Sequence, residues 1–361
     1  MKNENIRAFL SVDLSAAERN FQRIQKKTGR PVIAVVKADA YGHGAVALGR
    51  LFEALGARRL AVATLAEAQV LRQGGVECPI LILGETPPTP DGALALFRGG
   101  FVQTLVSPSY GKALLCAARA AGVPLGVEGK VDTGMGRIGF LLGEEALLPP
   151  LLEEGSLRLL GLFTHFYKGE DEEATREQCR IFDTFRGRLW ALGIPSHALH
   201  AAASSALHHP FARYGAVRPG LALYGLGEGG EPLATLYARC VRVKRVKRGA
   251  TLSYGGTRAE RDMTVATLSV GYGDGFLPPG GHCVWVGDAP CPVLGRVCMD
   301  MTLIDASRAR VREGDVLPVL TGRDLLGWKM EERYRAPVAI TARVPRRYVT
   351  HGIKRGLSPV D

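Results

Sequence analysis

Lys37 is the side chain whose place in the sequence points most directly to chemistry. It follows the apolar run PVIAVV, residues 31–36, which has the composition of a buried strand. In a parallel α/β barrel, the carboxyl ends of the strands carry the active site. A partly desolvated amine has a lowered pKa and can form a Schiff base with an aldehyde. An isolated lysine at a sheet edge more often just extends its ammonium group to water.

The residues that follow Lys37 add weight to the functional interpretation. Tyr41 supplies a phenol, and Gly42 and Gly44 supply backbone that a ligand can approach closely, at the start of the next predicted helix. The N-terminus of a helix binds phosphate through its unpaired N–H groups. From these residues alone, a site for a phosphate-bearing aldehyde and a purely structural role are about equally supported.

The elements that must position Lys37 alternate between short apolar runs and longer amphipathic segments. Eight segments are predicted as buried strands: residues 31–36, 59–63, 79–83, 101–106, 124–131, 157–165, the stretch around 197–200, and 220–225. Amphipathic helices are predicted at residues 45–56, 64–75 and 171–193. About eight such units predict an α/β fold of the TIM (β/α)8 barrel type, with a doubly wound open sheet as the structural alternative.

The pattern changes after residue 228. Short, Val-rich, alternating segments punctuated by Gly and Pro follow, with one weak helical stretch near residues 323–335. We therefore predict a barrel domain over residues 1–228 and a C-terminal, mostly-β domain over residues 229–361. The first ten residues include a short apolar run and could pair with the β domain.

The composition is that of a globular protein. The chain has 361 residues, of which 46% are hydrophobic and 22% are charged, so it can bury a sizeable core. No apolar run approaches the roughly 18 residues of a membrane span, and the N-terminus lacks a secretory signal pattern. The seven cysteines form no CxxC motif or ligand cluster. We expect a cytoplasmic protein with reduced thiols and no membrane partner.

The formal net charge of +11 leaves nucleic acid open as a partner. The densest basic stretch is RCVRVKRVKR, residues 239–248, where valines alternate with basic residues as in a half-exposed strand. No set of aromatic side chains accompanies it, so we favour a solvated strand over nucleic-acid binding. The histidines at 43, 200, 208 and 209 lack acidic or thiolate neighbours at zinc-site spacing, and no metal is predicted.

The segment VVKADAYGHG, residues 35–44, resembles the pyridoxal-phosphate lysine motif of the alanine racemase family, whose members are fold type III pyridoxal-phosphate enzymes. Further segments repeat the resemblance in the family's order: KVDTGMGRIGF (130–140), FTHF (163–166), HAAASSAL (200–207), VRPGLALYG (217–225), LSYGGT (252–257), LSVGYGDGF (268–276), GRVCMD (295–300) and RVPRRY (343–348). The resemblance implies a barrel followed by a β domain, pyridoxal 5'-phosphate as cofactor, and interconversion of L- and D-alanine, which supplies D-alanine for cell-wall peptidoglycan.

Two residues are implied as the catalytic bases. By the resemblance, Lys37 holds the cofactor and acts on one face of the substrate Cα. Racemisation also needs a base on the opposite face, because one base returning its own proton mostly restores the starting hand. Tyr254 in LSYGGT matches the family's second base, which comes from the partner subunit. The resemblance thus implies a homodimer with shared active sites, although a tyrosine before Gly-Gly is also ordinary turn chemistry.

The resemblance also assigns the cofactor contacts. Arg218 matches the arginine that donates to the pyridine nitrogen, and His165 matches the histidine beneath the cofactor ring. The implied phosphate contacts are Tyr41, Ser204, and the backbone of Gly220 and Leu221. Many members have a tyrosine just before RVPR that reaches the phosphate, but here this position is Ala342. A missing phenol would weaken cofactor binding or enlarge the substrate pocket.

The remaining matches concern the substrate. Arg137 matches the arginine that binds the substrate carboxylate, and Lys130 matches a position that is carbamylated in some members. From the other subunit, the implied substrate contacts are Cys298, Met299 and Asp300, and Tyr272 resembles a tyrosine at the substrate entrance. Without the resemblance, a surface lysine at 130 and a buried small thiol at 298 would be the simpler interpretations.

Three alternatives stay open at this stage. A serine or broad-specificity racemase on the same scaffold is suggested by Ala342 and by Ala203 before Ser204. A non-catalytic pyridoxal-phosphate carrier is the second, and the C-terminal segments argue against it. A decarboxylase of the same two-domain plan is the third, and GRVCMD resembles the racemases instead.

Overall fold

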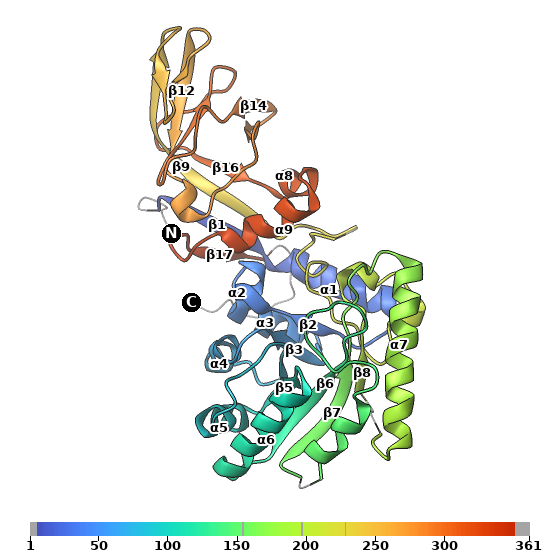
Figure 1. Ribbon diagram of the computed structural model, residues 1–361. Helices are drawn as coiled ribbons and strands as arrows, with labels where there is room; N and C mark the ends of the chain where they lie inside the picture. Colours follow the sequence, from blue (N-terminus) through green and yellow to red (C-terminus); the bar gives the residue numbers. More distant parts are fainter. Residues whose placement is uncertain (1–5, 154, 196–197, 228, 351–361) are drawn as a thin grey trace. The chain divides into compact units, whose positions relative to one another are not determined.

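The computed structural model describes residues 6–153, 155–195, 198–227 and 229–350, and the chain divides into two compact units (Figure 1). The barrel unit comprises Glu18–Ala40 and Ala45–Gly230. The β unit comprises Met1–Ala17, Tyr41–Gly44 and Glu231–Asp361. The β unit is therefore assembled from three separate parts of the sequence, one of which directly follows the segment that carries Lys37.

Seven parallel strands form the sheet of the barrel unit, and their spatial order is their order in the sequence. They are β2 (Ile33–Val35), β3 (Arg59–Val62), β4 (Ile80–Ile82), β5 (Phe101–Leu105), β6 (Leu125–Lys130), β7 (Leu157–Phe163) and β8 (Ala198–His200). Every residue of β2, β4 and β5 is buried. Strands buried on both faces are typical of a parallel sheet with helices outside and side chains packed inside, which confirms the expected fold class.

Helices alternate with these strands (Figure 1). They are α3 (Ala45–Ala54), α4 (Leu65–Gln73), α5 (Pro90–Gly99), α6 (Pro108–Ala121) and α7 (Glu172–Ala191), with α1 (Leu14–Thr28) before β2. The three helices predicted from amphipathic patterns correspond to α3, α4 and α7 and are confirmed. Thr64, Thr89, Ser107 and Asp171 begin their helices because each side chain accepts a backbone N–H of the first turn. Between β6 and β7 the described chain forms two short 3-10 helices, η1 (Glu145–Leu147) and η2 (Pro149–Leu151).

The eighth barrel position is filled by residues 215–219. Ala216 forms a parallel bridge with His200 of β8, and Val217 forms one with Val32 beside β2. The N–H of Ile33 donates to the Val217 carbonyl at 2.8 Å. These pairings close the ring of strands between β8 and β2.

The predicted strand over residues 220–225 is wrong, because residues 221–225 form turns. Leu223 donates its N–H to the Gly220 carbonyl at 2.8 Å, and Tyr224 donates to the Leu221 carbonyl at 3.1 Å. Leu223 and Tyr224 are fully buried. The apolar composition that suggested a strand is explained by burial of a turn. The predicted strand around residues 197–200 is β8, with residue 197 outside the described residues.

The β unit is built on a mixed sheet with the strand order β15-β12-β9-β1-β17, in which β16 also pairs with β9. The strands are β1 (Ala8–Asp13), β9 (Ala234–Val246), β12 (Met263–Leu268), β15 (Thr302–Asp305), β16 (Val316–Leu320) and β17 (Arg346–Val349). Two hairpins, β10 (Thr251–Leu252) with β11 (Thr257–Arg258) and β13 (Cys283–Val286) with β14 (Ala289–Pro292), lie off this sheet. The N-terminal strand β1 pairs antiparallel with β9 and parallel with β17.

Two helices, α8 (Gly322–Gly327) and α9 (Met330–Ala339), occupy the stretch where the sequence predicts a weak helix. Across the described ranges, no helix combines the length and the apolar character needed to cross a membrane.

The basic stretch lies at the C-terminal half of β9. Residues 234–240 alternate between buried and half-buried, but the register against β12 shifts near Val241, which is 42% exposed. Beyond this bulge both faces of the strand are open to solvent. Glu313 pairs with Arg242 at 3.0 Å, and Asp262 pairs with Lys247 at 2.8 Å. The stretch is therefore an exposed strand with part of its charge neutralised by neighbouring acids.

Candidate active site

A left-handed turn follows Lys37 at the end of β2. Ala38, Asp39 and Ala40 have φ values of 51°, 53° and 54°, and Tyr41 has a φ of 53°. Side chains other than glycine rarely adopt this conformation, and each such residue costs about 1–2 kcal/mol. Backbone strain of this kind concentrates at functional sites. The strained turn therefore indicates a functional site next to Lys37, independently of the chemistry of the lysine side chain.

Two carboxylates stabilise the left-handed turn. Oε1 of Glu67, at the start of α4, accepts the N–H of Ala38 at 2.7 Å. The other oxygen of Glu67 accepts the N–H of Ala63 at 2.7 Å, so one side chain ties β3 to the turn. Oδ1 of Asp39 accepts the N–H of Ala45, the first residue of α3, at 2.7 Å. These bonds offset part of the backbone strain.

Replacing Glu67 with glutamine is expected to lower the free energy of unfolding by about 1–3 kcal/mol. An amide has one acceptor oxygen, so one of the backbone N–H groups now bonded to the carboxylate would lose its partner. Urea unfolding followed by circular dichroism measures the change. The matched control is Glu177→Gln, which removes an exposed pair with Arg180 and should change stability by less than about 0.5 kcal/mol. Equal stability of the two variants would contradict the role given to Glu67.

Lys37 lies in a setting that favours the neutral amine. Burial lowers the pKa of Lys37, and the guanidinium groups of Arg137 and Arg218 lower it further, while Glu67 opposes the shift. A neutral amine is the nucleophilic form of lysine. Burial and the surrounding charges of the barrel unit thus favour the neutral form of the Lys37 amine.

Arg218 is buried, with 3% of its surface exposed, and its contacts orient the guanidinium group. It donates to the Thr164 carbonyl at 2.8 Å and to Nδ1 of His165 at 3.3 Å. It also donates to Nδ1 of His200 at 2.5 Å. Burial, followed by the charge of Arg218, lowers the pKa of His165 to about 3, so this imidazole stays neutral. The structure thus places Arg218 and His165, two of the predicted site residues, in direct contact.

Lys130 and Arg137 lie at the two ends of the loop that follows β6. The carboxylate of Asp132 accepts the N–H groups of Gly134, Gly136 and Arg137, each at 3.0 Å. Burial opposes ionisation of Asp132, but these three hydrogen bonds outweigh it and the pKa of Asp132 is lowered. Burial together with nearby Arg137 and Arg218 lowers the pKa of Lys130 to about 8. The loop thus presents Arg137 from a backbone folded around one carboxylate.

The predicted phosphate contacts of the barrel unit also lie together. Oγ of Ser204 accepts the N–H of Gly220 at 3.0 Å and the N–H of Ala222 at 3.1 Å. Ser204 begins the 3-10 helix η3 (Ser204–Ala206), and Gly220 and Leu221 begin the turn that replaces the predicted strand. A hydroxyl and adjacent N–H groups are suitable donors for a phosphate.

Tyr41 belongs to the short segment that groups with the β unit. Nε of Arg346 donates to the Gly42 carbonyl at 3.0 Å. Gly44 has a φ of +100°, and a Cβ at this residue would lie 1.8 Å from the hydroxyl of Tyr348, so only glycine fits. Ala342 lies in an exposed turn. Tyr348 is therefore packed against the segment that carries Tyr41.

Three loops of the β unit bring together the residues predicted to act from a partner subunit and Tyr272, which is predicted at the substrate entrance. Tyr272 and Gly273 donate their N–H groups to the carbonyls of Cys298 and Met299, at 3.0 and 2.9 Å. Ser253, next to Tyr254, lies 3.5 Å from the Cys298 thiol through its hydroxyl. Asp300 pairs with Arg343 at 2.6 Å. The exposed fractions of Tyr254, Tyr272 and Met299 are 67%, 45% and 52%, so these side chains face outward within the isolated chain.

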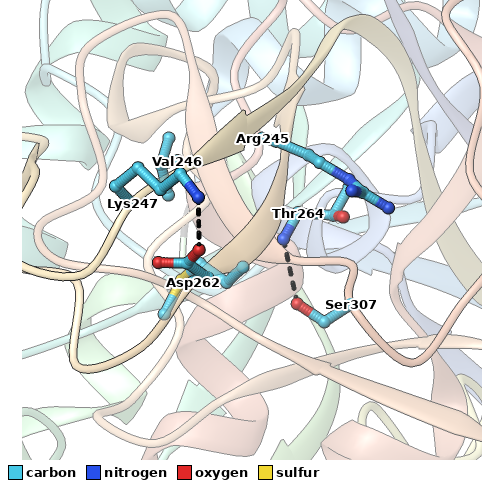
Figure 2. Close-up of a pocket in the computed structure, with 7 residues that line it drawn as sticks. Arg245, Val246, Lys247, Asp262, Thr264 and Ser307 are labelled. Atoms are coloured by element: carbon cyan, nitrogen blue, oxygen red, sulfur yellow. Dashed lines mark hydrogen bonds and ion pairs between the residues drawn. The ribbon is translucent and has the colours of Figure 1, made fainter.

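The β unit contains a cavity of about 320 Å³, whose lining residues are drawn in Figure 2. It is lined by the end of the basic stretch, the start of β12 and a residue after β15: Arg245, Val246, Lys247, Asp262, Met263, Thr264 and Ser307. Lys247 pairs with Asp262, and the Thr264 N–H donates to Oγ of Ser307 (Figure 2). None of the predicted site residues lines this cavity, and its polar groups largely satisfy one another. Within the described part of the chain, no three His, Cys, Asp or Glu side chains are grouped to hold a metal ion.

Sequence reasoning missed the residues that support the site. Asp132 had a readable signal, because glycines two and four residues later free the backbone to fold around its carboxylate. The sequence carries no signal for the bond between Glu67 and Ala38, because the capping box of α4 already accounts for a glutamate at this position. The left-handed turn is also unreadable, because the sequence KADAY favours no such conformation.

The barrel followed by a mostly-β unit, with an amine of lowered pKa at the end of its first barrel strand, defines a class of two-domain barrel enzymes. Family models for this class match almost the whole chain. The alanine racemase N-terminal domain matches residues 12–228, and the alanine racemase C-terminal domain matches residues 233–348. The chain belongs to the alanine racemase family.

Individual relatives agree with this assignment over nearly the full length. Alanine racemase 1 of Clostridium acetobutylicum is 34% identical over 94% of this chain and 95% of its own. The alanine racemase of Desulforamulus reducens is 35% identical over 94% of this chain and 98% of its own. Among solved structures, alanine racemase of Clostridium difficile 630 superposes with a TM-score of 0.88 at 28% identity, covering 96% of each chain.

Proposed function

We propose that the chain is a pyridoxal-phosphate-dependent amino-acid racemase that interconverts L-alanine and D-alanine. The observation that carries the proposal is Lys37, a partly buried amine of lowered pKa at the carboxyl end of a barrel strand, followed by a strained left-handed turn. The full-length relatives named alanine racemase support this reaction.

The donor set of the barrel unit fits pyridoxal phosphate by its chemistry. Lys37 supplies an amine for the aldehyde, Arg218 a fixed donor for the ring nitrogen, and His165 a neutral ring beside that arginine. The proposed phosphate contacts are Tyr41, Ser204, Gly220 and Leu221. When bound, the cofactor withdraws electrons from the substrate Cα and makes its proton acidic.

Two bases would then move that proton. In our proposal, the Lys37 amine works on one face of Cα, and the Tyr254 phenol of a second copy works on the other. The 67% exposure of Tyr254 and the adjacent positive φ of Ser253, 54°, support a phenol presented outward from a tight loop. The enzyme would therefore act as a homodimer, because neither copy alone completes a site.

Arg218 would bias the reaction toward racemisation. A guanidinium group is always protonated, so Arg218 would donate to the ring nitrogen and leave that nitrogen without a proton of its own. By keeping that nitrogen unprotonated, Arg218 would make the bound cofactor a weaker electron acceptor and so favour return of the proton to Cα over its transfer elsewhere. Its buried contacts with His200, Thr164 and His165 would keep the donor in place.

The substrate carboxylate is assigned to Arg137, whose planar guanidinium suits a carboxylate. From the second copy, we assign Tyr272, Cys298, Met299 and Asp300 to the substrate side of the site. The Asp132 carboxylate would hold the Arg137 loop in shape through its three backbone bonds. We place this activity in the cytoplasm, where it would supply D-alanine for cell-wall peptidoglycan.

Lys130 is expected to form a carbamate. Its pKa of about 8 lies well below the usual 10.5, so the neutral amine that reacts with carbon dioxide becomes the major form above pH 8. After incubation with ¹³C-bicarbonate, the carbamate resonance should grow as the pH rises from 7 to 9. It should be absent in Lys130→Gln. If the wild-type spectrum contains no resonance that disappears in Lys130→Gln, Lys130 does not form a carbamate.

A serine or broad-specificity racemase is the second candidate, favoured by the small, exposed Ala342 just before RVPR. The experiment that tests the choice is chiral chromatography of alanine and serine after incubation with the protein and added pyridoxal phosphate. We expect kcat/KM for alanine to exceed that for serine. A clear preference for serine would overturn the substrate, and no cofactor-dependent conversion of either would overturn the function.

A further inference from the structure

A hydrogen-bonded chain of polar side chains, all buried except the half-buried Arg59, crosses the interior of the barrel unit and ends at Arg218. It begins with Arg59 at the first residue of β3, which pairs with Oε1 of Glu128 on β6. Oε2 of Glu128 lies 2.8 Å from Nε2 of His200 on β8. Nδ1 of His200 lies 2.5 Å from Nη1 of Arg218. Four side chains, three from the strands β3, β6 and β8 and one from the segment after residue 217, are thus joined end to end.

The partners determine which nitrogen of His200 carries the proton. A guanidinium group has only donors, so Nδ1 of His200 must accept from Arg218 and carries no proton. The proton then lies on Nε2, where it is donated to the Glu128 carboxylate. Burial lowers the pKa of His200, which agrees with a neutral ring. Each hydrogen bond in the chain therefore has a fixed direction.

The charges in the chain compensate one another. The exposed fractions of Glu128, His200 and Arg218 are 0%, 1% and 3%, and a buried charge without a partner is costly. Burial opposes ionisation of Glu128, but the hydrogen bond from His200 and the ion pair with Arg59 lower its pKa overall. Glu128 is therefore a carboxylate that lies between two guanidinium groups, with a neutral imidazole as the link to one of them.

The far end of the chain opens toward the amino-terminal ends of the strands. A hollow of about 20 Å³, enough for about one water molecule, is lined there by Arg59, Glu128, His200 and the first residues of β2 and β8. Lys37 lies at the opposite, carboxyl end of β2. The chain thus runs from one end of the barrel toward the other.

We propose that Arg59, Glu128 and His200 are positioning residues that hold Arg218 as the hydrogen-bond donor to the pyridine nitrogen of pyridoxal phosphate. This inference rests on the proposed function and deepens it. Glu128 fixes the tautomer of His200, and that tautomer fixes the side of His200 that can accept from Arg218. If the carboxylate is lost, the tautomer with a proton on Nδ1 becomes accessible, and it would set two donors against each other at 2.5 Å.

The first test uses the protein without added cofactor. In ¹⁵N-labelled protein, long-range ¹H–¹⁵N correlation spectra distinguish the protonated from the unprotonated ring nitrogen, and His200→Gln assigns the signals. We expect His200 to be neutral, with its proton on Nε2, from pH 5 to pH 8. A proton on Nδ1, or titration within this range, would overturn the proposal. This result does not depend on racemase activity. It therefore distinguishes an error in the proposed hydrogen bonding from Arg59 to Arg218 from an error in the proposed function.

The second test uses Glu128→Gln with Glu145→Gln as the matched control. Glu145 is a second buried glutamate of the barrel unit, 4% exposed, which accepts the N–H of Gly143. We expect Glu128→Gln to shift the tautomer of His200 and to raise the dissociation constant of pyridoxal phosphate about tenfold, and Glu145→Gln to do neither. If Glu128→Gln changes neither the tautomer of His200 nor the affinity for pyridoxal phosphate, the positioning role of Glu128 is contradicted.

Arg59 provides a variant at the other end of the chain if Glu128→Gln does not fold. Arg59→Met removes the charge that keeps Glu128 ionised, and it should weaken cofactor binding in the same direction. Arg59→Lys keeps the charge and should restore most of the affinity. A loss of cofactor affinity that is equal in Arg59→Met and Arg59→Lys would indicate a packing role and overturn the electrostatic one.

Discussion

The Lys37→Ala variant is expected to lose at least about 10⁴-fold in racemase activity, because one substitution removes both the covalent attachment point of the cofactor and one catalytic base. The visible absorbance band that appears when wild-type protein is mixed with pyridoxal phosphate should be absent. The surrounding turn should persist, since its bonds come from Glu67 and Asp39 rather than from the lysine side chain.

Lys112→Ala is the matched control, because Lys112 is an exposed lysine on α6 of the same unit. It should keep both the absorbance band and the activity. Substantial racemisation by a folded Lys37→Ala protein would contradict the assignment of Lys37. Loss of activity in both variants would indicate a general effect on the protein rather than a catalytic one.

The Tyr254→Phe variant is expected to lose about 10²- to 10⁴-fold in racemisation while it keeps the cofactor band, because only the second base is removed. The remaining base still serves one face of Cα. In deuterium oxide, one enantiomer of alanine should therefore continue to exchange its α-proton, while the other should exchange far more slowly. Proton NMR of each enantiomer with the variant measures this asymmetry.

Tyr237→Phe is the control for this experiment, because Tyr237 is a half-buried tyrosine of β9 that stacks on Phe9. It should exchange and racemise both enantiomers as the wild type does. Equal, rapid exchange of both enantiomers by Tyr254→Phe would show that another group supplies the second base. The three loops that gather around Cys298 would then be the place to search for it.

The sequence predicts the barrel well because most barrel strands correspond to short, continuous apolar runs. Within the run PILIL, residues Ile80–Ile82 are buried on both faces, and such runs bounded by Gly, Pro or polar residues are typical of parallel strands. The exception is the eighth position. The apolar run at residues 220–225 folds as a buried turn, while the less apolar residues 215–219 make the pairings that close the barrel. An apolar run therefore predicts that a segment is buried, but it does not predict whether that segment pairs as a strand.

The candidate site divides in a similar way. Lys37, Arg218 and His165 could be predicted because each directly follows a strand or matches a motif, and the structure brings Arg218 and His165 into contact. The residues that hold them could not. Glu128 lies in the middle of a strand, 72 residues before its partner His200, and nothing in local spacing connects the two.

The conversion of alanine itself tests the central claim most directly. Purified protein with pyridoxal phosphate is incubated in separate samples with pure L-alanine and pure D-alanine, and the enantiomers are resolved by chiral chromatography. We predict that both samples converge on an equal mixture and that neither changes without the protein. Failure of the enantiomers to interconvert in the presence of the cofactor, or conversion of alanine to pyruvate instead, would contradict the account.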